Sequence, residues 1–356
     1  MTACLGGAFC LLIKQMDRKK ILLGIKIFVA ISLATQLGIF FYTSYQNGGI
    51  SFNIPFQRIS FCMLGIAFFM SWFEGIITGV RIFFLMRVIN PNITIITSIK
   101  AAYANIFMGA ITPSQTGGGV AQIYFISRDK IPYSQASAGS ILCFVSTLFF
   151  LITALISTAL FNSPTMGDSL QLMIKSASVA VGITTLIFIL CMLFTHLINN
   201  LKFTLFTHFK NKGIIKDENG KIENFLKNFA EGLVNCRESI LSMAKRGKMA
   251  LIVSYLITCI FFAVRLIIPY FIITGLGGNV SVADVMYIQL FITLISYFSP
   301  TPGSSGIAEL SSLVLMSSLV SSPVIAIYTF LWRLCTLYVN TSIGGILLYR
   351  ELKTSE

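Results

Sequence analysis

Long apolar runs separated by short polar segments dominate the pattern of this chain. Several runs approach or exceed the ~20 residues that a helix needs to cross a hydrocarbon layer ~30 Å thick. Because lipid offers the backbone no hydrogen-bond partners, such runs must fold as helices. The pattern predicts an all-α polytopic membrane protein with spanning helices at about 21–42, 59–81, 134–160, 173–196, 249–275 and 323–348.

Basic residues in the connecting segments set the predicted orientation. Lysine and arginine collect on the cytoplasmic side of membrane proteins. The segments that carry them here are 81–90, 128–131, 200–248 and the tail, whereas 161–172 and 276–283 carry none. We therefore predict a multi-pass protein of the cell (inner or plasma) membrane, with both termini cytoplasmic.

Two further apolar regions must return to the side from which they start. Region 92–127 begins and ends on the basic side, and region 284–320 begins and ends on the other side. Each is interrupted near its middle by proline and glycine, which do not continue a helix. We predict two re-entrant helical hairpins that enter from opposite faces, as inverted-topology repeats do, with tips that meet in a polar site.

The two interruptions resemble each other in sequence. Residues 112–122 read T-P-S-Q-T-G-G-G-V-A-Q and residues 299–309 read S-P-T-P-G-S-S-G-I-A-E, so that Pro113 aligns with Pro300 and Gln122 with Glu309. A second, shorter sequence similarity relates V-R-I around Arg81 to V-R-L around Arg265. The predicted order is a basic N-terminus (1–20), first helix and outer loop (21–58), repeat A (59–160), linking helix and basic amphipathic cytoplasmic segment (161–248), repeat B (249–348) and tail (349–356).

Composition favours lipid as the partner. Hydrophobic residues make up 55% of the chain and charged residues only 11%, too few to cover a soluble protein of this size. Of 26 Lys and Arg residues, ten lie between Lys202 and Lys248, where they would face anionic lipid. We predict membrane lipids, in particular anionic phospholipid, as partners and exclude nucleic acid. The eight scattered cysteines indicate no metal site, and we expect no cofactor.

Glu309 is the sharpest candidate for function. A carboxylate in an apolar arm is costly, so an ionisable residue at such a position points to function by default. It either binds substrate or anchors the free N–H groups of the interrupted helix. Arg333 is the simplest partner for it and Arg265 the alternative. Each arginine could instead hold a lipid phosphate through its planar fork.

Other candidate site residues surround the same predicted cavity. Glu74 could face it from the second helix. Arg81 could reach it, although its position near a helix end also suits snorkelling to the interface. Gln122 is the neutral counterpart of Glu309, so we expect the second copy to carry the chemistry. Hydroxyls and backbone N–H groups of the two breaks could bind an anion at half-helix N-termini, or the glycines could be hinges; these residues are Thr112, Ser114, Thr116, Gly117, Gly118, Gly119, Ser299, Thr301, Gly303, Ser304, Ser305 and Gly306.

Motifs of enzymes are missing from the sequence. The two histidines, His196 and His208, lie in or beside the linker, and there is no zincin motif, nucleophile elbow or Walker loop. We assign no catalytic residue.

The paired motifs, especially S-P-T-P-G-S-S-G-I-A-E ending at Glu309, resemble those of the lysylphosphatidylglycerol synthase transmembrane-region family, also called flippase-like or UPF0104 proteins. The resemblance covers about residues 20–350. Gln122 departs from it, since an acidic residue is expected there. Members resemble the membrane half of the multiple peptide resistance factor, which moves aminoacylated phosphatidylglycerol between leaflets. The chain ends at Glu356, so we expect no soluble aminoacyl-transfer domain and no synthase activity.

The resemblance implies a lipid transporter or flippase for an anionic or aminoacylated phospholipid, or a lipid-linked sugar. Two alternatives stay open. One is a membrane enzyme, or an enzyme's partner, in the synthesis of lysyl-phosphatidylglycerol or another lipid-linked headgroup. The other is a carrier of ions or small solutes. A homo-oligomer and a separate lipid-modifying enzyme are open as protein partners.

Overall fold

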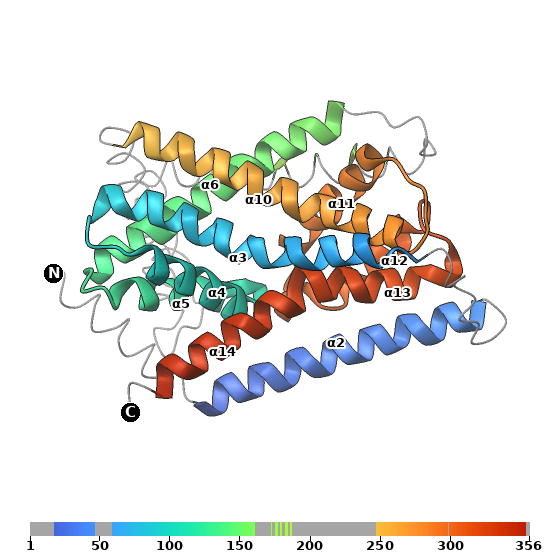
Figure 1. Ribbon diagram of the computed structural model, residues 1–356, viewed down its shortest axis with the longest axis horizontal. Coiled ribbons are helices and arrows are strands. Elements are labelled where there is room, and N and C mark those ends of the chain that lie inside the picture. Colours follow the sequence, from blue (N-terminus) through green and yellow to red (C-terminus); the bar gives the residue numbers. More distant parts are fainter. Residues whose placement is uncertain are drawn as a thin grey trace, which may run out of the picture.

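In a computed structural model, the chain is a bundle of helices (Figure 1). The structure describes residues 18–46, 59–160, 247–297 and 299–353, with isolated helical residues between 172 and 186, and this part contains no strand. The all-α class predicted from the sequence is confirmed. Four predicted features lie wholly or mostly outside the described residues: the basic N-terminus, the outer loop, the linking helix 173–196 and the amphipathic cytoplasmic segment.

Within the described residues, five helical runs are long and apolar enough to cross a membrane. Four are single helices: α2 (Arg18–Gln46), α3 (Phe61–Ile89), α6 (Tyr133–Leu160) and α10 (Lys248–Gly275). The fifth joins α13 (Ser322–Arg333), the π-helical η4 (Leu334–Tyr338) and α14 (Val339–Lys353). Each of the five matches a helix predicted from the apolar pattern. The start of α2 and the end of α14 lie at the same end of the bundle (Figure 1).

One predicted boundary is wrong. The sequence placed a basic connecting segment at 81–90, but α3 continues through Arg81 and Arg87 to Ile89. Ile82, Leu85 and Met86 are completely buried in this stretch. Burial of an apolar stripe at helical spacing stabilises the two extra turns, and the exposed Arg87 on another face does not oppose it.

Two short helical hairpins occupy opposite ends of the bundle (Figure 1). The first runs from α4 (Ile95–Ile111) through the 3₁₀ turn η2 (Pro113–Gln115) to α5 (Thr116–Ser127). The second runs from α11 (Val282–Tyr297) through η3 (Pro302–Ser304) to α12 (Ile307–Met316). An inverted-topology pair requires such a placement at opposite ends.

The breaks of the two hairpins touch each other. A side chain added at Gly303 would meet the Ala110 carbonyl oxygen of the first hairpin at 3.2 Å and the Phe28 ring of α2 at 2.9 Å. Gly303 has φ +58°, a conformation that only glycine adopts without strain. The sequence predicted that the tips would meet, and this close approach between backbones brings them together.

The register of the two breaks differs from the ungapped alignment. The second and third residues of each 3₁₀ turn have positive φ, Ser114 and Gln115 in one and Gly303 and Ser304 in the other. The turns therefore superimpose Pro113 on Pro302, not on Pro300 as predicted. After the turn, α5 begins at once, whereas Ser305 and Gly306 precede α12. As a result Glu309 lies in the first turn of its helix, and Gln122 lies in the second turn of α5.

The central helices are α3 and α10, which run antiparallel along each other (Figure 1). Gly275 permits their close approach at one end, where a side chain at this position would meet Leu64 Cδ2 at 2.7 Å. Apolar clusters flank the pair on both sides. One is formed mainly by α3, α4, α5 and α6, and the other by α10, α11, α12 and α13.

Candidate functional site

A buried ion pair joins the second break to the last membrane helix. Arg333 donates from Nε to Oε1 of Glu309 over 2.8 Å and from Nη2 to the Gly303 carbonyl over 2.8 Å. The other carboxylate oxygen of Glu309 accepts the Gly306 N–H at 2.7 Å, which caps α12. Both side chains are buried. The partner that the sequence favoured, Arg333, is therefore the one that the structure shows, and Arg265 is engaged elsewhere.

Hydroxyls of the second break also bond within the protein. Ser305 pairs with Ser32 of α2 at 3.0 Å, and Ser304 donates to the Ser296 carbonyl at 2.7 Å. Ser299 and Thr301 pair with each other at 2.8 Å. With these groups and Glu309 already bonded, the geometry of the second break matches the anchoring alternative stated for Glu309.

The first break has a different character. Ser114 and Thr116 are exposed. Thr112 donates to the Met108 carbonyl at 2.6 Å and accepts the Gly117 N–H at 2.9 Å, which ties α4 to α5. Gly118 faces Asn105, whose backbone oxygen would lie 2.8 Å from a side chain there. The sequence expected the chemistry in the second copy, but the exposed hydroxyls belong to the first.

Gln122 is the residue that the ungapped alignment pairs with Glu309. Its Oε1 accepts from Asn105 Nδ2 at 2.7 Å, while its Nε2 is buried without a hydrogen-bond partner. The first hairpin is therefore held here by a hydrogen bond between two amides, whereas an ion pair holds the second.

A second ion pair lies between α3 and α10. Arg265 Nη1 donates to Oε2 of Glu74 over 3.1 Å, and Asn340 Nδ2 of α14 reaches the same oxygen at 3.3 Å. Glu74 is 1% exposed, whereas the Arg265 side chain is 30% exposed. Oε1 of Glu74 and Oδ1 of Asn340 are both buried without a hydrogen-bond partner. An unsatisfied buried carboxylate oxygen is costly, so this pair is the strained polar centre of the described residues.

Arg81 lies inside the bundle. Its Nη1 donates to Thr147 of α6 and to Thr258 of α10, both at 3.1 Å, and its Nε is buried without a partner. Snorkelling, which the position near a predicted helix end suggested, does not occur. The helix continues past Arg81, so the side chain points between helices.

Two hydrogen-bonded groups of polar side chains, one around Glu74 and one around Arg81, lie between α3, α6, α10 and α14, and together we call them the central polar seam. Ser146 and Ser254 extend it by a 2.8 Å bond between their hydroxyls. Along α3, the seam extends over eleven residues from Ser71 to Arg81, about 15 Å of helix. Its members are Ser71, Glu74, Arg81, Ser146, Thr147, Ser254, Thr258, Arg265 and Asn340.

The π-helical turn η4 adjoins this seam directly after Arg333. The Val339 N–H bonds five residues back to Leu334, and the Ser71 hydroxyl donates to the Cys335 carbonyl. A π-turn displaces backbone carbonyls from their helical partners, and such turns are frequent at functional sites. Here a hydroxyl of the seam satisfies one of them.

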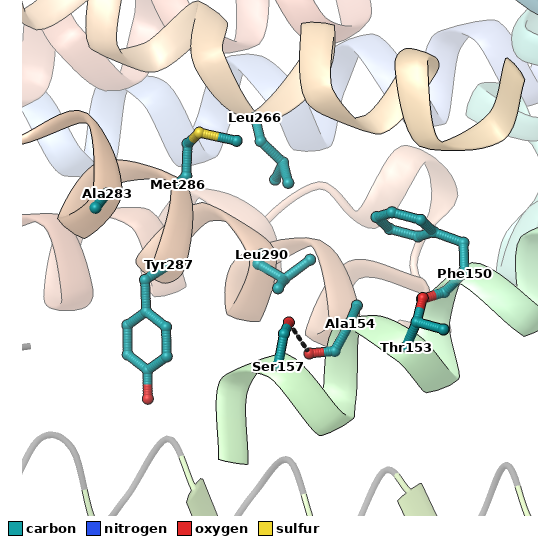
Figure 2. A pocket seen from close by; sticks show the side chains of 9 residues that line it. All are labelled: Phe150, Thr153, Ala154, Ser157, Leu266, Ala283, Met286, Tyr287 and Leu290. Atoms are coloured by element: carbon teal, nitrogen blue, oxygen red, sulfur yellow. Dashed lines mark hydrogen bonds between the residues drawn. The ribbon is translucent and has the colours of Figure 1, made fainter. Parts of the chain in front are cut away.

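A lateral groove opens beside α10. Its volume is about 430 Å³ and its walls are α6, α10 and α11 (Figure 2). Figure 2 shows Leu266 of α10 above Leu290 of α11, with Phe150 of α6 at one end. The walls are almost entirely apolar, and Leu266 is the residue next to Arg265. The groove and the Glu74–Arg265 pair of the seam therefore involve consecutive residues of α10.

Sequence reasoning missed Thr147, Thr258 and Asn340. A signal for one of them was present, because Thr258 lies seven residues before Arg265 as Glu74 lies seven before Arg81. Thr147 and Asn340 carried no such signal, since hydroxyls and amides are common in apolar helices. Among the described residues, no group of three or more His, Cys, Asp or Glu side chains could hold a metal ion.

Comparison with known proteins agrees with this architecture. The family described as "Lysylphosphatidylglycerol synthase TM region" matches residues 21–344. The chain belongs to this family. A UPF0104 membrane protein of Archaeoglobus fulgidus is 27% identical over 323 residues, which cover 89% of this chain and 94% of the relative. One of Pyrococcus horikoshii is 23% identical over 296 residues, 81% of this chain and 87% of that protein. No solved structure matches the chain.

The family match extends over both hairpins and the central polar seam. The resemblance noted in the paired motifs is thus confirmed at the level of the family. The family name refers to the membrane region of a synthase, and the matched residues contain helices only in the part that the structure describes.

Proposed function

We propose that this protein is a membrane lipid transporter that moves an anionic or aminoacylated phospholipid, or a lipid-linked sugar, between leaflets. The observation that carries the proposal is the Glu74–Arg265 pair. It places a partly exposed cation on a buried carboxylate, in the middle of helices that are long and apolar enough to span a membrane. Ionised residues in such helices mark substrate or ion pathways.

Arg265 is the proposed contact for the lipid headgroup. A guanidinium binds a phosphate through two parallel N–H donors, a geometry that lysine cannot reproduce. Arg333 is less suited to this role because its pair with Glu309 is closed and almost fully buried, whereas 30% of the Arg265 side chain is exposed. A phosphate that approached Arg265 would compete with Glu74 for the same cation.

The lateral groove supports a lipid over a water-soluble substrate. A pocket of about 430 Å³ lies within the ~300–1,000 Å³ range of ligand sites, and apolar side chains form most of its wall. A lipid would place its acyl part in the groove and its headgroup at the seam. A small hydrophilic solute would gain nothing from the groove.

Transfer of lipid by the purified full chain tests the proposal. Protein reconstituted in vesicles that contain a labelled anionic phospholipid should accelerate movement of the label between leaflets. In Arg265→Gln this rate should fall about tenfold or more, since hydrogen bonds to charged groups contribute ~1.5–3 kcal/mol. Arg87→Gln is the matched control, because Arg87 is an exposed arginine on α3 that bonds a backbone carbonyl.

Equal transfer rates in Arg265→Gln and the wild type would remove the headgroup role of Arg265. A membrane enzyme is distinguished by lipid mass spectrometry of a deletion strain. A missing lipid product indicates synthesis, whereas a complete lipid inventory with altered sidedness indicates transport. Uptake of ions or solutes by vesicles without the labelled lipid would favour a solute carrier instead.

A further inference from the structure

Glu74 and Asn340 share one hydrogen bond, and each keeps one buried oxygen without a partner. A carboxyl group and a primary amide can pair through two parallel hydrogen bonds, one from the amide nitrogen and one from the protonated carboxyl. The first bond is present, from Asn340 Nδ2 to Oε2 of Glu74 at 3.3 Å. The atoms that would form the second bond, Oε1 of Glu74 and Oδ1 of Asn340, are both buried and both lack a partner.

Two oxygen acceptors without a donor are an unfavourable pair. Each loses its bonds to water on burial, and nothing in the described protein replaces them. A proton on Oε1 removes the deficit of both atoms at once, because it converts one acceptor into a donor aimed at the other. Turning the amide over would relieve only one of the two atoms, since Nδ2 would then serve Oε1 while Oδ1 would lie against Oε2, which already accepts from Arg265.

The surroundings show which charges compete for this proton. The titratable groups that face Glu74 are Arg265 from α10, Tyr103 from α4, Tyr297 from α11 and Cys335 from η4. Arg265 alone is cationic, and it favours the ionised carboxylate. The Tyr103 hydroxyl is committed to the Trp72 carbonyl at 2.9 Å. Removal of the Arg265 charge from the carboxylate is thus the event that makes protonation favourable.

From this geometry we infer that Glu74 is a proton-binding site, in which the proton bridges Oε1 of Glu74 and Oδ1 of Asn340 and releases Arg265 from its counter-ion. The proton comes from bulk water and returns there, and no covalent bond to carbon changes. Glu74 thereby alternates between an ionised state that pairs with Arg265 and a protonated state that makes both bonds to Asn340. The link to lipid rests on the proposed function, in which the released Arg265 is the cation that binds an anionic headgroup. Proton binding and lipid binding then favour each other.

Infrared difference spectra of the purified full chain, recorded between neutral and acidic pH, test the proton site directly. Besides the carbonyl bands of the accessible carboxylic acids, the wild type should show at acidic pH one further band, from a buried protonated carboxylic acid, with its own frequency and pH midpoint. Glu74→Gln should lose this band. Asn340→Leu should keep the band at a shifted frequency, because the protonated carboxyl has lost its acceptor.

Glu351→Gln is the matched control, since Glu351 pairs with Arg128 at an accessible site, and it should leave the band unchanged. If Glu74→Gln does not fold, the shift in Asn340→Leu carries the test alone. A band that persists in Glu74→Gln, that does not move in Asn340→Leu, or that responds to sodium instead of pH would overturn the assignment.

Lipid transfer in vesicles supplies a second readout. Wild-type transfer should rise as the pH falls, and Glu74→Gln, whose amide can donate to Asn340 at any pH, should transfer lipid without pH dependence. Absence of lipid transfer in every variant, with the infrared band present, would refute the proposed function and leave the proton site. Normal transfer without the band would refute the proton site alone.

Discussion

Arg265 on α10 forms an ion pair with Glu74 on α3, and Arg81 on α3 donates a hydrogen bond in the opposite direction, to Thr258 on α10. Thr258 and Glu74 each lie seven residues before the arginine of their own repeat. Reciprocal contacts between equivalent positions are what a two-fold relation produces. The two contacts between the central helices are therefore reciprocal, as the predicted inverted repeats require. One contact is an ion pair, and the other is a hydrogen bond from a guanidinium to a neutral hydroxyl. The seam is therefore chemically asymmetric.

Neutralising the buried carboxylate of the second hairpin should be strongly destabilising. Glu309→Gln leaves Arg333 as a buried charge without a counter-ion, at a cost of about 3–5 kcal/mol. The free energy of unfolding in mixed detergent micelles measures this loss. Glu351→Gln breaks a more exposed pair with Arg128 and should cost about 0–1 kcal/mol. The double variant Glu309→Leu/Arg333→Met should recover part of the stability, and similar losses at Glu309 and Glu351 would contradict the anchoring role.

The hydroxyl of Thr258 should contribute more than a typical helix threonine. It accepts from the Arg81 guanidinium at 3.1 Å, so Thr258→Val should lower the free energy of unfolding by about 1.5–3 kcal/mol. Thr78→Val is the control, because Thr78 on α3 donates to a carbonyl of its own helix. Thr147 shares the same Arg81 nitrogen. A double-mutant cycle of Thr147→Val with Thr258→Val should therefore be non-additive, and strict additivity would argue against a shared donor.

Adding one methyl group at Gly344 should force α14 away from α4. The Cβ of Gly344→Ala would overlap the Tyr103 carbonyl and lie 2.8 Å from Phe107 Cβ. Overpacking of this kind costs about 1–3 kcal/mol. Gly65→Ala is the matched control in α3, where nothing lies within 4 Å, and it should stabilise the helix by about 0.5–1 kcal/mol. Thermal unfolding followed by circular dichroism distinguishes the two, and equal midpoints would show that the two helices can separate freely.

The two breaks should respond oppositely to changes at their left-handed residues. Gly303→Ala adds a side chain at φ +58° and crowds Phe28, so it should cost at least about 1–2 kcal/mol of stability. Ser114 holds φ 50° at the equivalent position, but it is exposed. Ser114→Gly should therefore leave the stability unchanged or raise it. Denaturant titration of both variants provides the measurement, and destabilisation by Ser114→Gly would indicate that the serine hydroxyl matters for the fold.

Much of the fold could be predicted because membrane insertion depends on local composition. The apolar runs around α2, α3, α6, α10 and α13–α14 identified their helices, since lipid requires every backbone group to be bonded within its own segment. The breaks were visible for a similar reason, because proline and glycine act on the backbone locally. The pair of Glu309 with Arg333 was also foreseen, as buried charges require a partner.

Contacts across the bundle could not be predicted in the same way. The sequence does not reveal that Glu74 pairs with Arg265, or that Arg81 points inward, because helix rotation and crossing decide both. The superposition of Pro113 on Pro302 depends likewise on backbone torsions that ungapped alignment ignores. The exposure of the first break and the burial of the second follow from packing against α2, where Ser305 meets Ser32.

The sequence by itself determined that this protein is a helical membrane protein with two related interruptions, because those features follow from hydropathy and backbone chemistry along the chain. Only the tertiary structure decided which polar groups are satisfied and which are not. It closed the second break around Glu309 and left Glu74 and Asn340 with unpaired oxygens. Hydrogen bonding between distant helices depends on positions in space, and these are fixed by packing of the whole bundle.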